Sequence, residues 1–243
     1  MSRSFGAAAA AYEAGRPDYP LEAVKWMLHP ARLADRAPRV ADVGAGTGKL
    51  TRVAVELGAQ VVAIDPDPQM LDSLRTHVVG VPTYEGTAEN LPLPDGALDA
   101  VVLGQAWHWV DPAAGSAEVA RVLRPGGVLG LAWNIRDESV PWVRRLTEVM
   151  TPSNAEAMLA EGGPEVGPEF APLEHRRWRW SRPMTRASLL NMAHSRSYVI
   201  TAEAGVRARL EADLAALFDD IGAVGGTVVD LPYVTQAYRA VRR

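Results

Sequence analysis

The amino-acid sequence predicts an α/β fold built on a parallel β-sheet, and three observations support this prediction. From residue 39 onward, short apolar runs alternate with helix-length segments, an order typical of strands joined by right-handed crossover helices. The apolar runs are continuous, as expected of parallel strands that are covered on both faces. A glycine-rich turn, residues 44–48, separates the first apolar run from the first helix-length segment.

Local patterns define the expected elements in chain order. Before Pro38 we expect an alanine-rich helix over residues 7–14, ended by Gly15 and Pro17, and a second helix opened by Pro20. The next predicted strands are residues 39–43, 60–64, 83–84, 98–103 and 128–133. The predicted helices between them are residues 48–57, 68–75 and 112–123.

The second half of the chain is less regular. Residues 151–172 are rich in Pro and Gly and predict a loop or a weakly ordered insertion, whereas residues 176–182 alternate like a strand. Helices are expected over residues 186–194 and 203–218, and a last strand over 227–234. With no convincing linker, we predict one domain over 1–243. It comprises a helical cap at 1–38, a core at 39–134 and a variable substrate-side region at 135–243.

The composition excludes several kinds of site. The chain has no cysteine, which excludes disulfides, thiolate metal centres and a cysteine nucleophile, and we expect no metal. Its 25 Lys and Arg against 29 Asp and Glu give a net charge of −4, which argues against a general nucleic-acid partner. Neither a signal peptide nor an uncharged apolar span is apparent, so we expect a cytoplasmic protein without a membrane partner. The oligomeric state is not indicated.

Residues 40–48, with the sequence VADVGAGTG, carry the strongest chemical signal. Three glycines allow a sharp turn and a close ligand approach, and we expect the exposed amides of the turn to bind polar or anionic groups. A phosphate-binding P-loop is disfavoured because Val43 and Leu50 replace its Gly and Ser/Thr. Lys49 stands where the dinucleotide fingerprint needs its third glycine. Asp65, roughly 20 residues further on, could accept hydrogen bonds from ribose hydroxyls.

Several motifs together resemble those of class I S-adenosylmethionine-dependent methyltransferases. They are Asp42 with the G-x-G-x-G turn, Asp65 with the PDP that follows it, GTAENLP at 86–92, GQAWHW at 104–109 and RVLRPGG at 121–127. The resemblance covers residues 39–134 and is closest to small-molecule enzymes of the methyltransferase type 11 group, such as trans-aconitate and ubiquinone/menaquinone-pathway methyltransferases. Residues 12–20, YEAGRPDYP, resemble the N-terminal cap of that group. The resemblance implies a Rossmann-like, seven-stranded, mostly parallel sheet with helices on both faces and the last strand antiparallel.

The same resemblance implies a binding site for S-adenosyl-L-methionine, with S-adenosyl-L-homocysteine as product. The residues expected to bind this cofactor are Tyr12, Arg16, Asp42, Gly44, Ala45, Gly46, Gly48, Asp65, Pro66, Met70, Thr87, Ala88, Glu89, Gln105 and Ala106. The turn would hold the methionine part, Asp65 the ribose, and the segment around Ala88 the adenine.

Methyl transfer requires chiefly alignment and a dry site, because the sulfonium already activates the methyl carbon. A base is needed only if the acceptor must lose a proton, and His108 is the candidate, although packing between its neighbouring tryptophans is an alternative. Tyr19, Trp107 and Trp109 are candidate acceptor contacts.

We therefore predict an enzyme that transfers a methyl group to a small-molecule acceptor by in-line displacement. The alternatives are a cofactor-binding sensor or partner protein without catalysis, and an RNA or protein methyltransferase.

Overall fold

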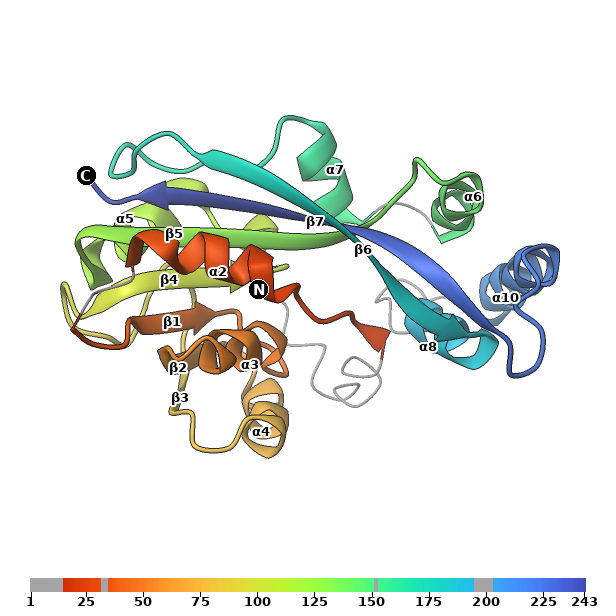
Figure 1. The fold of residues 1–243 in the computed structure, drawn as a ribbon, viewed down its shortest axis with the longest axis horizontal. Coiled ribbons are helices and arrows are strands. Elements are labelled where there is room, and N and C mark those ends of the chain that lie inside the picture. Colours follow the sequence, from red (N-terminus) through yellow and green to blue (C-terminus); the bar gives the residue numbers. More distant parts are fainter. Residues whose placement is uncertain (1–14, 32–34, 151–152, 195–202) are drawn as a thin grey trace.

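The computed structural model describes residues 15–31, 35–150, 153–194 and 203–243, so Tyr12 and the helix expected over 7–14 lie outside it. A seven-stranded sheet has the order β3-β2-β1-β4-β5-β7-β6 (Figure 1). Its strands are β1 (Arg39–Val43), β2 (Gln60–Asp65), β3 (Thr83–Glu85), β4 (Leu98–Gly104), β5 (Leu123–Arg136), β6 (Glu174–Thr185) and β7 (Val228–Val241). Strands β1 to β5 pair in parallel, and β7 is antiparallel to both of its neighbours. The predicted α/β sheet with an antiparallel last strand is confirmed.

The central strands are apolar on both faces because helices cover both. Val40 and Val102 belong to one hydrophobic cluster, with α2 (Leu21–Leu28) and α3 (Lys49–Glu56). Helix α4 (Pro68–His77) packs on the same face, against β2 (Figure 1). Ala41 and Leu103 belong to the cluster on the opposite face, with α5 (Pro112–Val122). The alternation of side chains along each strand thus places Asp42, between Ala41 and Val43, on the face of α3.

Strands β5, β6 and β7 extend well beyond β1 and β4, and β6 and β7 carry a third hydrophobic cluster (Figure 1). We call this part the distal lobe: the ends of β6 and β7 at residues 180–185 and 228–233, with α6 (Pro141–Met150), α8 (Arg186–His194) and α10 (Ala204–Asp220). Its cluster includes the fully buried side chains of Leu146, Leu189, Phe218 and Leu231. The lobe is a core of its own at one end of the sheet.

Several details differ from the sequence-based expectation. Strands β5 and β6 are longer than the strands predicted over 128–133 and 176–182. The predicted loop over 151–172 contains a helix, α7 (Asn154–Ala160), which a capping box of Ser153 and Glu156 begins. The high Pro and Gly content of the segment hid this signal. Helix α6 was not predicted, although Val143, Leu146 and Met150 follow helical spacing. Strand β7 continues to Val241 rather than ending at residue 234.

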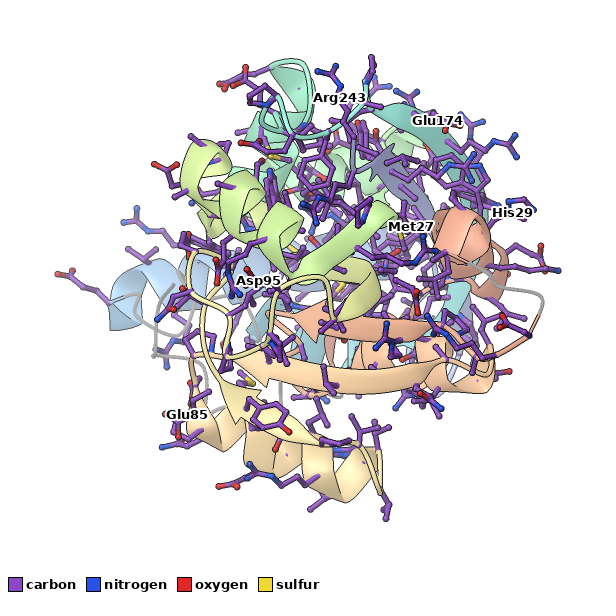
Figure 2. All side chains as sticks on the ribbon, turned by 90° about the vertical axis from the view of Figure 1, so that its left-hand side faces the viewer. Met27, His29, Glu85, Asp95, Glu174 and Arg243 are labelled. Atoms are coloured by element: carbon purple, nitrogen blue, oxygen red, sulfur yellow. The ribbon has the colours of Figure 1, made fainter. Side chains whose placement is uncertain are left out.

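The end of the sheet where the parallel strands begin is closed by an ion-pair cluster around Asp99 of β4. Its buried carboxylate accepts two hydrogen bonds from Arg36, at 2.6 and 2.8 Å, and one from Arg124 Nε at 2.7 Å. Burial alone would raise the pKa of Asp99, but these guanidinium groups and the Arg39 amide hold it well below its usual range. Figure 2 views this end, with Met27 on α2 as a landmark. A ligand-binding site is therefore expected at the opposite end of the sheet, where the parallel strands finish.

Candidate cofactor-binding and active site

A cleft lies at the carboxyl ends of β1 and β4. Its lining is formed by Arg16, Pro17, Tyr19, Asp42, Gly44, Ala45, Gly46, Thr47, Lys49, Leu50, Gly104, Gln105 and Asn134. Open α/β sheets bind their ligands at this edge, beyond the carboxyl ends of the strands. The glycine turn, the end of β4 and the N-terminal segment 16–19 thus meet around one space.

The glycine turn owes its shape to left-handed backbone. Gly44, Gly46 and Gly48 have φ values of 68°, 56° and 90°, which side-chain-bearing residues rarely adopt. A Cβ at Gly48 would lie 2.8 Å from Leu74 and 2.9 Å from Val78, so α4 and the residue after it pack directly on the turn. At Gly46 a Cβ would meet nothing within 4 Å, because this glycine borders the cleft. The two glycines therefore serve different purposes, packing and ligand access.

The amides of the turn are engaged within the protein. Gly44 and Ala45 donate to the Ile64 carbonyl at 2.8 and 3.1 Å, and Gly48 donates to the Ala45 carbonyl at 2.9 Å. Gly46 donates to Asp65 Oδ2 at 2.9 Å. All four amides thus already have an acceptor within the protein, and binding of a ligand by the turn stays a prediction. These four hydrogen bonds fix the shape of the turn, and its glycines allow close approach of a ligand.

Asp42 is the buried charge of the cleft. Its side chain is 0 % exposed, and Oδ2 accepts a hydrogen bond of 2.5 Å from the Thr51 hydroxyl. Oδ1 has no hydrogen-bond partner among the described residues. Burial raises the pKa of Asp42 to about 7, although the Thr51 hydroxyl and amide act against this rise. A buried oxygen without a donor favours a cationic or N–H-bearing group beside it.

Asp65 fixes the geometry of the turn from the neighbouring strand. Its Oδ2 accepts the Gly46 amide and its Oδ1 accepts the Asp67 amide, both at 2.9 Å. Burial raises the pKa of this carboxyl group. Because each carboxylate oxygen has a second lone pair, Asp65 can hold the turn and still accept from a ligand hydroxyl.

The residues expected around an adenine do not line the cleft. Met70 and Ala88 are buried in the protein, and Glu89 accepts the Asp111 amide at 3.1 Å. Pro66 and Thr87 are half-buried. These residues follow β2 and β3, beside the cleft rather than along its described lining.

The end of β4 is a strained turn. Gln105 has a φ of 55°, unlike every other non-glycine residue in the described chain. Its amide donates to the Ala132 carbonyl at 2.8 Å and its Nε2 donates to the Asn134 carbonyl at 2.9 Å. Next to it, a Cβ at Gly104 would lie 2.5 Å from the Tyr19 hydroxyl. Glycine at this position leaves room for the Tyr19 ring, which covers this end of the cleft.

His108 and its two flanking tryptophans lie in the turn that follows, at Trp107–Trp109. Trp107 is buried in the core, where its Nε1 donates to the Glu165 carbonyl at 2.9 Å, so it packs rather than lining the cleft. Ala106 is also buried in that core. Trp109 is exposed, with its ring 4.9 Å from the His108 ring. Trp107 is thus ill placed for the acceptor contact expected of it, whereas Trp109 remains accessible.

The hydrogen bond of His108 decides which nitrogen carries its proton. Trp133 Nε1 donates to His108 Nδ1 at 3.2 Å, and an indole N–H can only donate. Nδ1 is therefore unprotonated, and the proton of the neutral ring lies on Nε2. Burial, with a smaller contribution from the Arg16 charge, lowers the pKa of His108 to about 4. At neutral pH this imidazole is a hydrogen-bond donor at Nε2, which does not suit the role of base expected from the sequence.

Several lining residues were not predicted: Pro17, Thr47, Lys49, Leu50, Gly104 and Asn134. Asn134 carries a sequence signal that the prediction did not use. It follows the apolar run 128–133 at the end of a strand, the same kind of position that Asp42 and Gln105 occupy on their strands. A polar residue at that position was a usable signal. Lys49 and Leu50 open α3 and are brought to the cleft by the turn itself.

Comparisons with known proteins agree with this architecture. Residues 41–131 match the family model described as a methyltransferase domain. An uncharacterized methyltransferase of Mycobacterium tuberculosis is 46% identical over 99% of this chain and 96% of its own length. An uncharacterized methyltransferase-like protein of Schizosaccharomyces pombe is 32% identical over 97% and 94%. A rice 2-methyl-6-phytyl-1,4-hydroquinone methyltransferase is 42% identical over 42% of this chain and 30% of its own.

Solved structures share the fold at lower identity. The YcgJ protein of Bacillus subtilis superposes with a TM-score of 0.53 at 20% identity, covering 91% of this chain and 98% of its own. An N-methyltransferase of Haemonchus contortus in complex with phosphomonomethylethanolamine and S-adenosylhomocysteine gives 0.54 at 16% identity, covering 99% and 58%.

The strand order and the glycine turn define a Rossmann-like methyltransferase fold. By its full-length relatives, the chain belongs to the class I S-adenosylmethionine-dependent methyltransferases. In the described part of the chain, no helix combines the length and apolar character needed to cross a membrane. The same residues hold no cluster of three His, Asp or Glu side chains arranged to take a metal ion.

Proposed function

We propose that the cleft binds S-adenosylmethionine and that the protein transfers its methyl group to a small-molecule acceptor. The observation that carries this proposal is the buried Asp42 Oδ1, which lacks a donor among the residues described and belongs to the cleft lining. A ligand with an ammonium group would supply that donor. Arg16 also lines the cleft and offers a guanidinium to a carboxylate. The amino-acid end of the cofactor presents both groups, so the lining fits it.

The remaining residues of the cleft provide alignment and exclude water. When bound, the cofactor would supply an activated methyl carbon. A lone pair of the acceptor forms the new bond to this carbon, and the electron pair of the broken carbon–sulfur bond stays on sulfur. Tyr19, which is 9% exposed, covers the end of β4 and keeps water from that region. Gln105 is held at both its amide and its side chain, so the strand end beneath is rigid. Fixed geometry of this kind accounts for a large part of catalysis when the electrophile is already activated.

His108 fits the role of a donor to the acceptor molecule. Its Nε2–H is fixed by the Trp133 hydrogen bond and stays neutral above about pH 5, since its pKa is about 4. A neutral donor suits an acceptor that presents an oxygen or another lone pair. No proton then needs to pass to the enzyme before transfer.

A small molecule is favoured over RNA by the packing of β6. Trp178 lies against Trp26 with ring centroids 5.6 Å apart, and Trp180 stacks on Tyr233 at 5.2 Å. Aromatic rings that hold single-stranded bases must offer a free face, and these are engaged within the protein. The matching rice protein is named for a small quinol substrate, which agrees with this class.

Calorimetry with S-adenosylhomocysteine tests the site. The wild-type protein should bind, and more tightly as pH rises through about 7, because only the ionised Asp42 attracts an ammonium group. Asp42→Asn should weaken binding at pH 8 at least about tenfold and remove this pH dependence. Asp72→Asn, which removes an exposed carboxylate of α4, is the matched control and should bind like wild type.

Equal affinities of wild type and Asp42→Asn would refute the assigned site, and no binding by wild type would refute the proposal. A screen of small-molecule acceptors with radiolabelled S-adenosylmethionine then separates an enzyme from a non-catalytic binder. Binding without transfer to any acceptor would favour the binder.

A further inference from the structure

A buried chain of hydrogen bonds crosses the sheet from β6 to the cleft. Trp180 Nε1 donates to Thr235 Oγ1 at 2.9 Å, and Thr235 Oγ1 donates to Asn134 Oδ1 at 2.6 Å. Asn134 Nδ2 then donates to the Asp18 carbonyl at 3.1 Å. Asn134 and Thr235 are directly opposed in the β5–β7 register. Three strands are thus linked to the N-terminal segment by one polar path.

The donor and acceptor of each hydrogen bond in this path are determined by Trp180, where the path begins. Trp180 has a single N–H and no acceptor, so the Thr235 hydroxyl must accept from it and use its own proton toward Asn134. The Asn134 amide is then oriented with its oxygen toward β7 and its NH₂ group toward Asp18. No other orientation of the amide satisfies all three bonds. Such a fully satisfied buried path specifies one arrangement.

The last hydrogen bond of this path joins two parts of the cleft lining, Asn134 near the end of β5 and the N-terminal segment around Asp18. Asn134 lines the cleft, and its own carbonyl accepts from the side chain of Gln105 at 2.9 Å. Asp18 lies between Pro17 and Tyr19, which also line it. A second tie from β6 reaches the same segment, because Arg182 donates to the Gly15 carbonyl at 2.9 Å. Residues 15–19 are therefore held over the cleft from the distal side.

The ties on the opposite side are of a different kind. The Asp18 carboxylate pairs with Arg52 and, at 3.4 Å, with Lys49, and it is 60% exposed. Ion pairs in such an exposed position contribute little and are screened by salt. The hydrogen-bond chain is buried at Thr235 and Asn134, which are 0% and 7% exposed. This buried chain therefore persists at high ionic strength, where the ion pairs of Asp18 are screened.

We propose that Asn134 is a positioning residue that keeps residues 15–19 closed over the cleft, and that Trp180 and Thr235 hold it in that role. The paired strands β6 and β7 thereby set how long a molecule stays in the cleft. The part of the proposal that concerns S-adenosylmethionine and its product rests on the proposed function. The closure of the segment does not.

Hydrogen exchange on the ligand-free protein tests the closure. Thr235→Val and Trp180→Phe remove one hydrogen bond of the chain each while keeping most of the side-chain volume. Both should speed exchange of the Asp18 and Tyr19 amides about three- to tenfold at high salt, as expected for one lost hydrogen bond. Tyr233→Phe is the matched control, because it removes a buried hydroxyl of β7 that donates to Met192 Sδ and takes no part in the hydrogen-bond chain. It should leave that exchange within twofold of wild type.

Stopped-flow dissociation of S-adenosylhomocysteine tests the consequence. Thr235→Val and Trp180→Phe should raise the dissociation rate about three- to tenfold, and Asn134→Asp more, since its carboxylate accepts from Thr235 but has no N–H for the Asp18 carbonyl. Exchange and dissociation that match the Tyr233→Phe control in both variants would overturn the proposal. Faster exchange with an unchanged dissociation rate would overturn the role of β6 and β7 in setting the residence time of the ligand. Faster exchange in a protein that binds no S-adenosylhomocysteine would support the closure while refuting the proposed function.

Discussion

The cleft and the distal lobe are built by different means. The cleft rests on short-range features: three glycines with positive φ, and two carboxylates that the ends of β1 and β2 bring together. Its carboxyl groups are buried with raised pKa values. The distal lobe is apolar and joins segments as far apart as Val143 and Tyr233. Between these two regions, backbone strain and buried carboxyl groups are thus found where a ligand would bind, and apolar packing dominates in the lobe.

The packing of the lobe can be tested with Phe218→Ala, which should produce the largest loss of stability. Phe218 is fully buried at the end of α10, among side chains from α6 and β7. Truncating it should lower the free energy of unfolding by about 3–5 kcal/mol, through lost burial and the cavity left behind. Val206→Ala on the exposed part of the same helix should change it by less than about 0.5 kcal/mol. Urea denaturation measures both, and equal midpoints would mean that the lobe has no packed core.

The glycine turn allows a finer comparison, between two glycines with the same kind of backbone. Gly48→Ala should destabilise by about 2–3 kcal/mol, because a left-handed residue is strained and the new Cβ meets Leu74 and Val78. Gly46→Ala has open space and should cost about 1 kcal/mol. Its Cβ would enter the cleft, so it should weaken S-adenosylhomocysteine binding more than it weakens the fold. Thermal unfolding and calorimetry together check this crossover, and its absence would mean that the turn acts only on stability.

The same contrast explains what the sequence could predict. The central strands and the glycine turn were predictable because their signals are local: apolar runs, and glycines at fixed spacing before Lys49. The lobe was only partly predictable. Residues 141–150 form a helix whose apolar side is buried by contacts with α10, far along the chain.

Within the site, it was easier to predict which residues gather there than to predict their protonation and hydrogen bonds. His108 was correctly noticed as a residue after β4, but its protonation depends on Trp133, which comes from another strand. Likewise, nothing near Gly44 in the sequence reveals that its amide is bonded to Ile64. Motifs report which residues gather at a strand end. The hydrogen bonds that decide their chemistry arise from pairing between strands.

The state of His108 offers the prediction with the smallest expected effect. If it is a neutral donor, ¹⁵N NMR should show a proton on Nε2 and no titration between pH 8 and about 5, because its pKa is about 4. The ring should charge only below that range. Trp133→Phe removes the donor to Nδ1 and should allow the other tautomer to appear. A His108 signal that titrates near pH 6.5 in the wild-type protein would contradict this assignment.

Activity separates the two roles further, once an acceptor is known. His108→Gln keeps an N–H donor but cannot act as a base, so it should retain kcat/KM within about threefold, whereas His108→Ala should lose about tenfold, the worth of one hydrogen bond. A catalytic base would behave otherwise, because its removal typically costs 10²–10⁴-fold and both variants would fail alike. A large loss in His108→Gln would therefore restore the base and require Trp133 to release Nδ1 when the acceptor binds. The expected effect is small because the Trp133 indole N–H occupies the lone pair of His108 Nδ1. His108 can therefore donate its Nε2 proton but has no free lone pair with which to accept one.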